Sequence, residues 1–107
     1  MQTSADVVFK SLADPTRRAI FERLCREGEQ TVWELTEDAG VSQPAVSKHL
    51  GQLKSAGLVR DRRQGRETHY SAEPKALRPL VDWFGFYASF WREKFDALED
   101  LLKRIDQ

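Results

Sequence analysis

The feature that most constrains this fold is a pair of short, capped helical segments joined by a tight turn. Thr31 and Glu34 have the spacing of a capping box, in which each side chain accepts a hydrogen bond from the other residue's backbone N–H. Gly40 ends the first segment, because glycine readily adopts the left-handed conformation that closes a helix. Ser42 then caps a second segment that ends at Gly57. The pattern predicts two helices separated by a turn of only a few residues.

The second segment has one apolar face and one polar face. Val46, Leu50 and Leu53 recur at helical spacing and are expected to face the core. The opposite face has no acidic residue between Ser42 and Ser55, whereas an ordinary solvated face mixes glutamate with lysine. We interpret this helix-turn-helix pair as presenting a DNA-binding surface, with an ordinary solvated face as the alternative. The residues on that surface are Gln43, Ser47, Lys48, Gly51 and Lys54.

A β-hairpin is predicted directly after this pair. Two β-prone runs within Leu58–Tyr70 flank Gln64-Gly65, where the glycine supplies the positive φ of a tight turn. Arginines are expected at the tip, from which they reach phosphates or a narrow minor groove. The hairpin is therefore interpreted as a wing, and the alternative is a solvated hairpin whose arginines only add solubility. The tip residues are Arg62, Arg63 and Arg66.

The charge of the chain is segregated, although its formal net charge is zero. From Ser42 to His69 there are six basic residues and two acidic ones. Residues 1–41 carry eight acids and five bases, and the stretch from Asp82 onward carries six acids and four bases. Phosphate binding needs a local positive field rather than a high overall charge. The distribution is compatible with a basic DNA-binding segment flanked by two acidic parts of the chain.

The N-terminal part predicts two further helices in the same domain. The first covers about Ser4–Leu12, and the second runs from Pro15 to Arg26 behind Asp14, a favoured N-cap before a proline. The second helix is expected to bury three apolar side chains and, beside them, the thiol of Cys25. Because Cys25 is the only cysteine, no internal disulfide forms. Those three apolar residues are Ile20, Phe21 and Leu24.

A long helix is expected from about Lys75 to Ile105, and its aromatic residues occupy more than one stripe. A monomer would expose several hundred Å² of this surface, roughly the size at which a patch on a soluble protein becomes an interface. A second copy of the chain covers it in our interpretation, since two-fold dimers are the commonest assembly. The alternative is a pocket for a hydrophobic or aromatic effector. Its lining would be Trp83, Phe84, Tyr87 and Trp91.

Several strings of this sequence resemble the ArsR/SmtB family of dimeric bacterial repressors. They are residues 12–18 (LADPTRR), 42–50 (SQPAVSKHL), 56–59 (AGLV), 63–66 (RQGR) and Tyr70. The resemblance implies one winged helix-turn-helix domain over residues 1–107, mainly α with a small β-hairpin: four helices, two strands and a last helix. It also implies that residues 1–12 and 75–107 form the dimer interface. The side chains expected there are Val8, Phe9, Leu12, Trp83, Phe84, Tyr87, Phe90, Trp91, Phe95, Leu98 and Leu102.

For the DNA-binding surface, the resemblance implies that Gln43, Ser47 and Lys48 contact bases or phosphates in the major groove. Glutamine can pair bidentately with adenine, and lysine suits guanine or phosphate. His49 lies beside this face, where contact with phosphate and packing against the hairpin are both open alternatives. The full expected set is Ser42, Gln43, Pro44, Ser47, Lys48, His49, Lys54, Arg62, Arg63 and Arg66.

The metal-sensing motifs of the family are missing here. Many members bind metals through a Cys-x-Cys pair in the third helix or through Asp, His and Glu pairs in the last helix. Residues 32–38 (VWELTED) contain no cysteine, and the expected last helix contains no histidine. Cys25, His49 and His69 are too scattered to converge on one ion. We therefore predict no metal site and no cofactor.

The predicted function is a dimeric, cytoplasmic repressor that binds an inverted repeat in double-stranded DNA. The chain contains no run of about 18 apolar residues that would span a membrane, and the N-terminus lacks a signal-peptide pattern. No glycine-rich phosphate loop or nucleophile with an assembled base points to an enzyme. Activation instead of repression, a protein-interaction module on the same surface, and an unidentified small-molecule or protein effector stay open. The basic recognition face favours DNA over protein as the partner.

Overall fold

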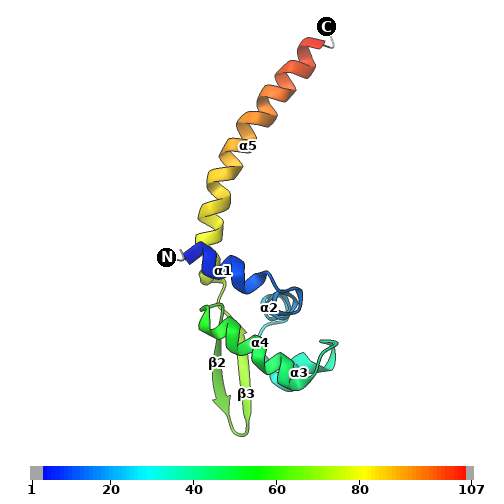
Figure 1. Cartoon of the computed structure of the whole chain (residues 1–107), viewed down its shortest axis with the longest axis vertical. Coiled ribbons are helices and arrows are strands. Elements are labelled where there is room, and N and C mark those ends of the chain that lie inside the picture. The colour runs from blue at the N-terminus through cyan, green and yellow to red at the C-terminus, as the bar shows by residue number, and fades with distance from the viewer. Residues whose placement is uncertain (1–3, 106–107) are drawn as a thin grey trace.

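The structure is a computed structural model that describes residues 4–105 of the chain. A helical body carries a β-hairpin at one end, and a long last helix projects from the other, giving a molecule 70 Å long (Figure 1). The elements in chain order are α1 (Ser4–Leu12), α2 (Pro15–Glu27), β1 (Gln30–Thr31), α3 (Val32–Glu37), α4 (Gln43–Ser55), β2 (Val59–Gln64), β3 (Glu67–Ala72), the 3₁₀ helix η1 (Pro74–Leu77) and α5 (Arg78–Ile105).

The core lies between α2, α3, α4 and the start of the hairpin. As predicted, α4 contributes Val46, Leu50 and Leu53, each completely buried, and α2 contributes its three apolar residues. Val8 of α1 joins the same cluster. A core of this kind fixes α4 against the body, so the opposite face of α4 is held in a defined orientation.

Helices α2, α3 and α4 begin at the positions predicted from their capping residues. Asp14 accepts a hydrogen bond from the backbone N–H of Arg17 at 2.9 Å, and Ser42 caps α4. Thr31 and Glu34 form the complete capping box of α3. Each cap satisfies backbone N–H groups that have no partner within the helix. The short α3 therefore starts at a fixed point, although it ends at Glu37, before the expected end of that segment.

The sheet has three antiparallel strands in the order β1-β3-β2, where two strands were expected. The additional strand, β1, is only two residues long, too short for an alternating pattern to be recognised. The predicted turn was displaced by one residue. Gln64 pairs with Glu67, so the turn consists of Gly65 and Arg66, with Gly65 at φ +65°. Glycine thus takes the first turn position, where a positive φ is required.

Cys25 is exposed, so the expectation of a buried thiol was wrong. It follows the buried Leu24 by one residue, and one step along an α-helix turns the side chain by about 100° away from the core. Partial desolvation nevertheless raises the pKa of the Cys25 thiol, and the nearby Glu22 carboxylate adds to the rise.

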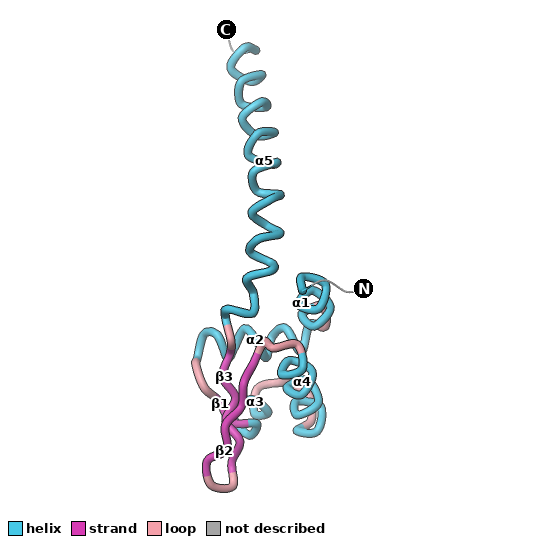
Figure 2. Tube along the Cα trace, turned by 90° about the vertical axis from the view of Figure 1, so that its left-hand side faces the viewer, coloured by secondary structure: helices cyan, strands magenta, loops and turns pink. Residues whose placement is uncertain are grey.

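The C-terminal region is one 3₁₀ turn followed by a 28-residue helix, rather than a continuous helix from Lys75. Packing between α1 and the beginning of α5 joins the helix to the body, and from Val81 to Ile105 every residue is exposed. Figures 1 and 2 both show α5 leaving the body. None of the helices within residues 4–105 is sufficiently long and apolar to span a membrane.

Candidate nucleic-acid interface

Helix α4 presents three different sides to its surroundings. One side is buried in the core. A second side faces α2, where Gln52 accepts a hydrogen bond from the Arg17 guanidinium. The third side is open to solvent. It holds the predicted recognition residues Gln43, Pro44, Ser47, Lys48 and Lys54, all exposed.

His49 lies on the side of α4 that faces α2 and is half-buried. Its imidazole is near Asp14, whose carboxyl pKa is lowered first by the hydrogen bond from the Arg17 N–H and further by the charge of His49. The Nδ1 atom is buried and has no hydrogen-bond partner within residues 4–105. The imidazole therefore lies beside the start of α2.

Arg62 does not lie at the tip of the hairpin, contrary to expectation. It sits in β2 opposite His69, and its guanidinium binds both carboxylate oxygens of Glu29, at 2.5 and 3.0 Å. Ser71 of β3 donates to the same carboxylate at 3.2 Å. The Arg62 hydrogen bond is the main reason that the pKa of Glu29 lies below its ordinary value of 4.5. Arg62 thus joins the hairpin to the segment before β1.

Two more cations of the basic segment also have acidic partners. Lys54 binds Asp61 at 2.9 Å, and this hydrogen bond raises the pKa of the Lys54 ammonium. Arg60 lies 3.1 Å from the Glu73 carboxylate. Half of the six basic residues between Ser42 and His69 are therefore neutralised inside the protomer. Lys48, Arg63 and Arg66 have no carboxylate partner within residues 4–105.

A groove of about 250 Å³ brings together residues from α3, α4 and the hairpin. Gln43 and Ser47 line it from α4, and Arg66 lines it from the turn. Trp33 of α3 lines it as well and is 64% exposed. Trp33 was not among the binding residues predicted from the sequence, although a tryptophan between the two residues of a capping box is recognisable there. The remaining lining residues are Thr31, Val32, Glu67 and Thr68.

The aromatic residues at the beginning of α5 form a cluster with α1. The rings of Phe9 and Trp83 are 5.1 Å apart, and Trp83 lies 4.6 Å from Tyr87. Of the other α1 residues expected at an interface, Val8 is buried in the core of the protomer and Leu12 is half-buried against it. Val8 thus has almost no surface left for a second chain. The other expected interface residues, all exposed on α5, are Phe84, Phe90, Trp91, Phe95, Leu98 and Leu102.

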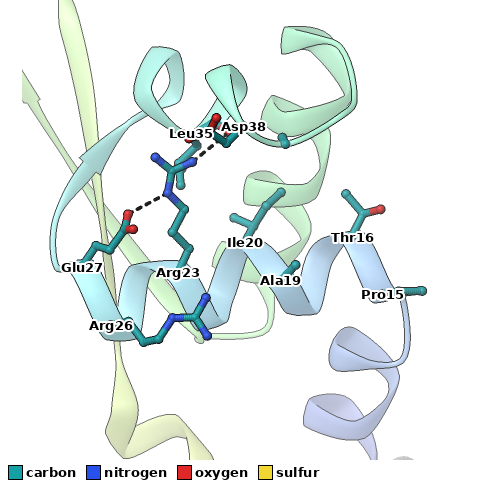
Figure 3. A pocket seen from close by; sticks show the side chains of 10 residues that line it. Pro15, Thr16, Ala19, Ile20, Arg23, Arg26, Glu27, Leu35 and Asp38 are labelled. Atoms are coloured by element: carbon teal, nitrogen blue, oxygen red, sulfur yellow. Dashed lines mark hydrogen bonds and ion pairs between the residues drawn. The ribbon is translucent and has the colours of Figure 1, made fainter.

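A separate hollow of about 420 Å³ lies between α2 and α3, and it shares no lining residue with the groove beside α4 (Figure 3). Arg23 reaches from α2 toward α3, pairs with Glu27 at 2.7 Å and donates to the Leu35 carbonyl at 3.4 Å. Its main contribution is structural, since it joins the two helices. Within residues 4–105, no three His, Cys, Asp or Glu residues lie close enough together to hold a metal ion.

Comparison with known sequences identifies relatives of one kind. Residues 14–61 match the sequence model described as "Bacterial regulatory protein, arsR family". The transcriptional repressor SdpR of Bacillus subtilis is 37% identical over 76 residues, which cover 71% of this chain and 83% of SdpR. The arsenic resistance transcriptional regulator ArsR1 of Pseudomonas putida is 46% identical over 69 residues, 64% of this chain, but the match spans only 54% of ArsR1.

Solved structures give the same result. The ArsR family transcriptional regulator RHA00566 superposes with a TM-score of 0.73 at 32% identity, covering 83% of this chain and 91% of that one. The homodimeric winged helix-turn-helix DNA-binding domain Mb0332 of Mycobacterium bovis superposes with a TM-score of 0.64 at 30% identity, covering 80% and 79%. The Mb0332 domain is homodimeric.

Proposed function

The chain belongs to the ArsR family of winged helix-turn-helix, DNA-binding transcriptional regulators, and on that basis we propose that it is a homodimeric repressor. In this proposal two copies bind one inverted-repeat operator in double-stranded DNA. Such a protein acts on chromosomal DNA, which places it in the cytoplasm. The sensing of metals, which the names of some relatives imply for those proteins, forms no part of the proposal.

The observation that carries the proposal is the composition of the open face of α4 and its surroundings. Gln43 and Ser47 offer hydrogen-bonding groups to base edges from the N-terminal half of the helix, the part that enters the major groove in helix-turn-helix proteins. Three cations without a carboxylate partner among residues 4–105 lie on α4 and the hairpin: Lys48, Arg63 and Arg66. This arrangement separates base readout from phosphate binding, as DNA recognition requires.

The exposed face of α5 supports dimerisation. Apolar residues recur along it at alternating steps of three and four residues, the heptad spacing of helices that pack side by side. A monomer would leave this face in water over a helix about 42 Å long. A second copy offers the same stripe in return, so a two-fold contact buries both. The stripe consists of Val81, Phe84, Ala88, Trp91, Phe95, Leu98, Leu102 and Ile105.

Two-fold symmetry then sets the form of the operator. Two copies of α4 related by a dyad read two half-sites in opposite directions, with centres about 10 base pairs apart. A ligand or partner relieves repression only if it binds the DNA-competent and incompetent arrangements of the dimer with different affinities. The aromatic surface of α5 is a candidate for such an effector only where dimerisation leaves it uncovered.

Transcription in vitro tests the repressor assignment. The template carries a binding site enriched from random DNA, placed across a promoter, and the matched template carries the same site with its bases scrambled. We expect added protein to lower the transcript from the first template and to leave the second unchanged. More transcript from the first template would make the protein an activator, and equal transcript from both would contradict promoter control by this site.

A further inference from the structure

Trp33 is a large aromatic residue at the surface of the short helix α3. Its side chain is 64% exposed. Within residues 4–105 its ring stacks on no other aromatic ring, and its N–H has no hydrogen-bond acceptor. A tryptophan combines a large apolar surface with one polar N–H, a pairing found where a protein meets a partner that is part apolar and part polar.

The backbone beneath Trp33 is held in place from several directions. The capping box of Thr31 and Glu34 brackets it, and Leu35, 1% exposed, anchors α3 in the core. The Thr36 hydroxyl donates to the Val32 carbonyl at 2.7 Å. Because α3 is fixed in this way, the indole is presented from a rigid support rather than from a mobile loop.

The neighbours of Trp33 indicate what it meets. The groove that it lines also contains Gln43 and Ser47, the candidate base readers, and Arg66, which has no carboxylate partner within residues 4–105. Glu67 lines the groove too, next to Arg66 in the chain, and its carboxylate lies 3.7 Å from the His69 imidazole. A phosphate that reaches this groove meets the cation of Arg66 and the hydroxyl group of Ser47 among the residues that line it.

We propose that Trp33 belongs to the DNA-binding surface and contacts the sugar-phosphate backbone of the strand at the edge of the major groove. The ring packs on a deoxyribose, and the indole N–H donates to a phosphate oxygen. Such a contact sets the position of α4 on the duplex and is independent of base sequence. This inference rests on the proposed DNA-binding function and adds a positioning residue from α3 to it.

The test compares wild type with Trp33→Ala, Trp33→Phe and a control, Glu37→Gln, which changes an exposed residue of α3 outside the groove. Affinity is measured by fluorescence anisotropy on two labelled duplexes of equal length, one enriched from a random pool and one of random sequence. Melting temperatures establish that each variant is folded.

We expect Trp33→Ala to weaken binding to both duplexes by about the same factor, roughly 5- to 10-fold, as for the loss of one hydrogen bond with its apolar packing. Trp33→Phe keeps the ring without the N–H, so its loss is expected to be smaller, and Glu37→Gln binds like wild type. The change in tryptophan emission on adding DNA is expected to be smaller in Trp33→Phe than in wild type.

Two results would overturn the proposal. Unchanged affinity of Trp33→Ala for both duplexes, while wild type binds them, removes Trp33 from the interface and leaves the DNA-binding function intact. A loss confined to the enriched duplex means that Trp33 contacts a base instead of the backbone. If wild type binds neither duplex, the proposed function fails first, and the exposed indole then points to a protein partner.

Discussion

At the scale of single residues, Gln43 is the side chain that we propose reads a base. Replacing it with alanine removes the amide that pairs with adenine, so preference at one position in each half-site is expected to relax, at a cost of roughly 1–3 kcal/mol. The measurement is the affinity for the enriched duplex and for single-base variants of it. Gln52→Ala is the matched control, because Gln52 lies on the same helix but faces Arg17. Unchanged base preference in Gln43→Ala would remove its role in readout.

The arginines of the hairpin are expected to differ from one another. Arg63 and Arg66 have no carboxylate partner within residues 4–105, whereas Arg62 is held by Glu29. Replacing Arg63 or Arg66 with alanine should weaken binding to all sequences and lower the slope of log affinity against log salt by about 0.9 for each lost phosphate contact. Arg62→Ala should alter that slope less. A loss in Arg66→Ala that affects only the enriched site would make the hairpin a reader of bases.

The contribution of a charge to DNA binding could not be predicted from its position in the sequence. Arg62 and Glu29 are 33 residues apart and meet only because β1 and β2 both pair with β3. The basic segment was recognisable from residue counts, but which of its cations lack a carboxylate partner among residues 4–105 is known only from the positions of the carboxylates in the fold. The polar face of α4 was predictable, since helical periodicity and the absence of acids are both visible in the sequence.

At the scale of elements, the Glu29–Arg62 pair fixes the hairpin to the segment that precedes β1. The pKa of Glu29 is lowered in the folded protein, chiefly by the Arg62 hydrogen bond, so this pair stabilises the fold above the ordinary value of 4.5. That contribution disappears as the pH falls through the lowered value. Melting temperatures of Glu29→Gln and wild type should therefore differ at neutral pH and converge in acid. A constant difference down to the lowest pH would contradict this role for the carboxylate.

The helices were more predictable than the strands for a physical reason. Capping residues and prolines act within a few positions of the chain, so Asp14, Thr31 and Ser42 mark helix starts that tertiary contacts do not override. The two residues of β1 are a strand only because β3 lies beside them. The hairpin was expected from its glycine, but the position of the turn depends on the register of pairing, which local sequence specified to within one residue.

At the scale of the whole molecule, the long exposed α5 supports our proposal that two copies of the chain form a homodimer. Leu98→Glu places a charge in the middle of the apolar stripe, where burial in a dimer interface would cost several kcal/mol. Sedimentation velocity should give twice the chain mass of 12.4 kDa for wild type and a monomer for this variant, with much weaker DNA binding. Asp96→Asn changes a residue of α5 outside the stripe and should stay dimeric. A monomeric wild type would contradict the dimer.

The exposed apolar surface of the last helix was predictable from its number of aromatic residues. Which of these residues pack against α1 within the same protomer could not be predicted. Trp83 packs against both Phe9 and Tyr87 while all three stay exposed, whereas Val8 belongs to the core, so α1 contributes less free surface to a second chain than its sequence suggested. The tertiary fold decides which part of an amphipathic helix is already covered.

Selection from a random pool of duplex DNA at moderate salt, followed by sequencing, tests the central claim most directly. Sequence-specific binding by a two-fold dimer predicts enrichment of an inverted repeat whose half-site centres are about 10 base pairs apart. Failure to enrich any motif, with binding that only fades as salt rises, would contradict the account, because the face of α4 would then bind phosphates without reading bases.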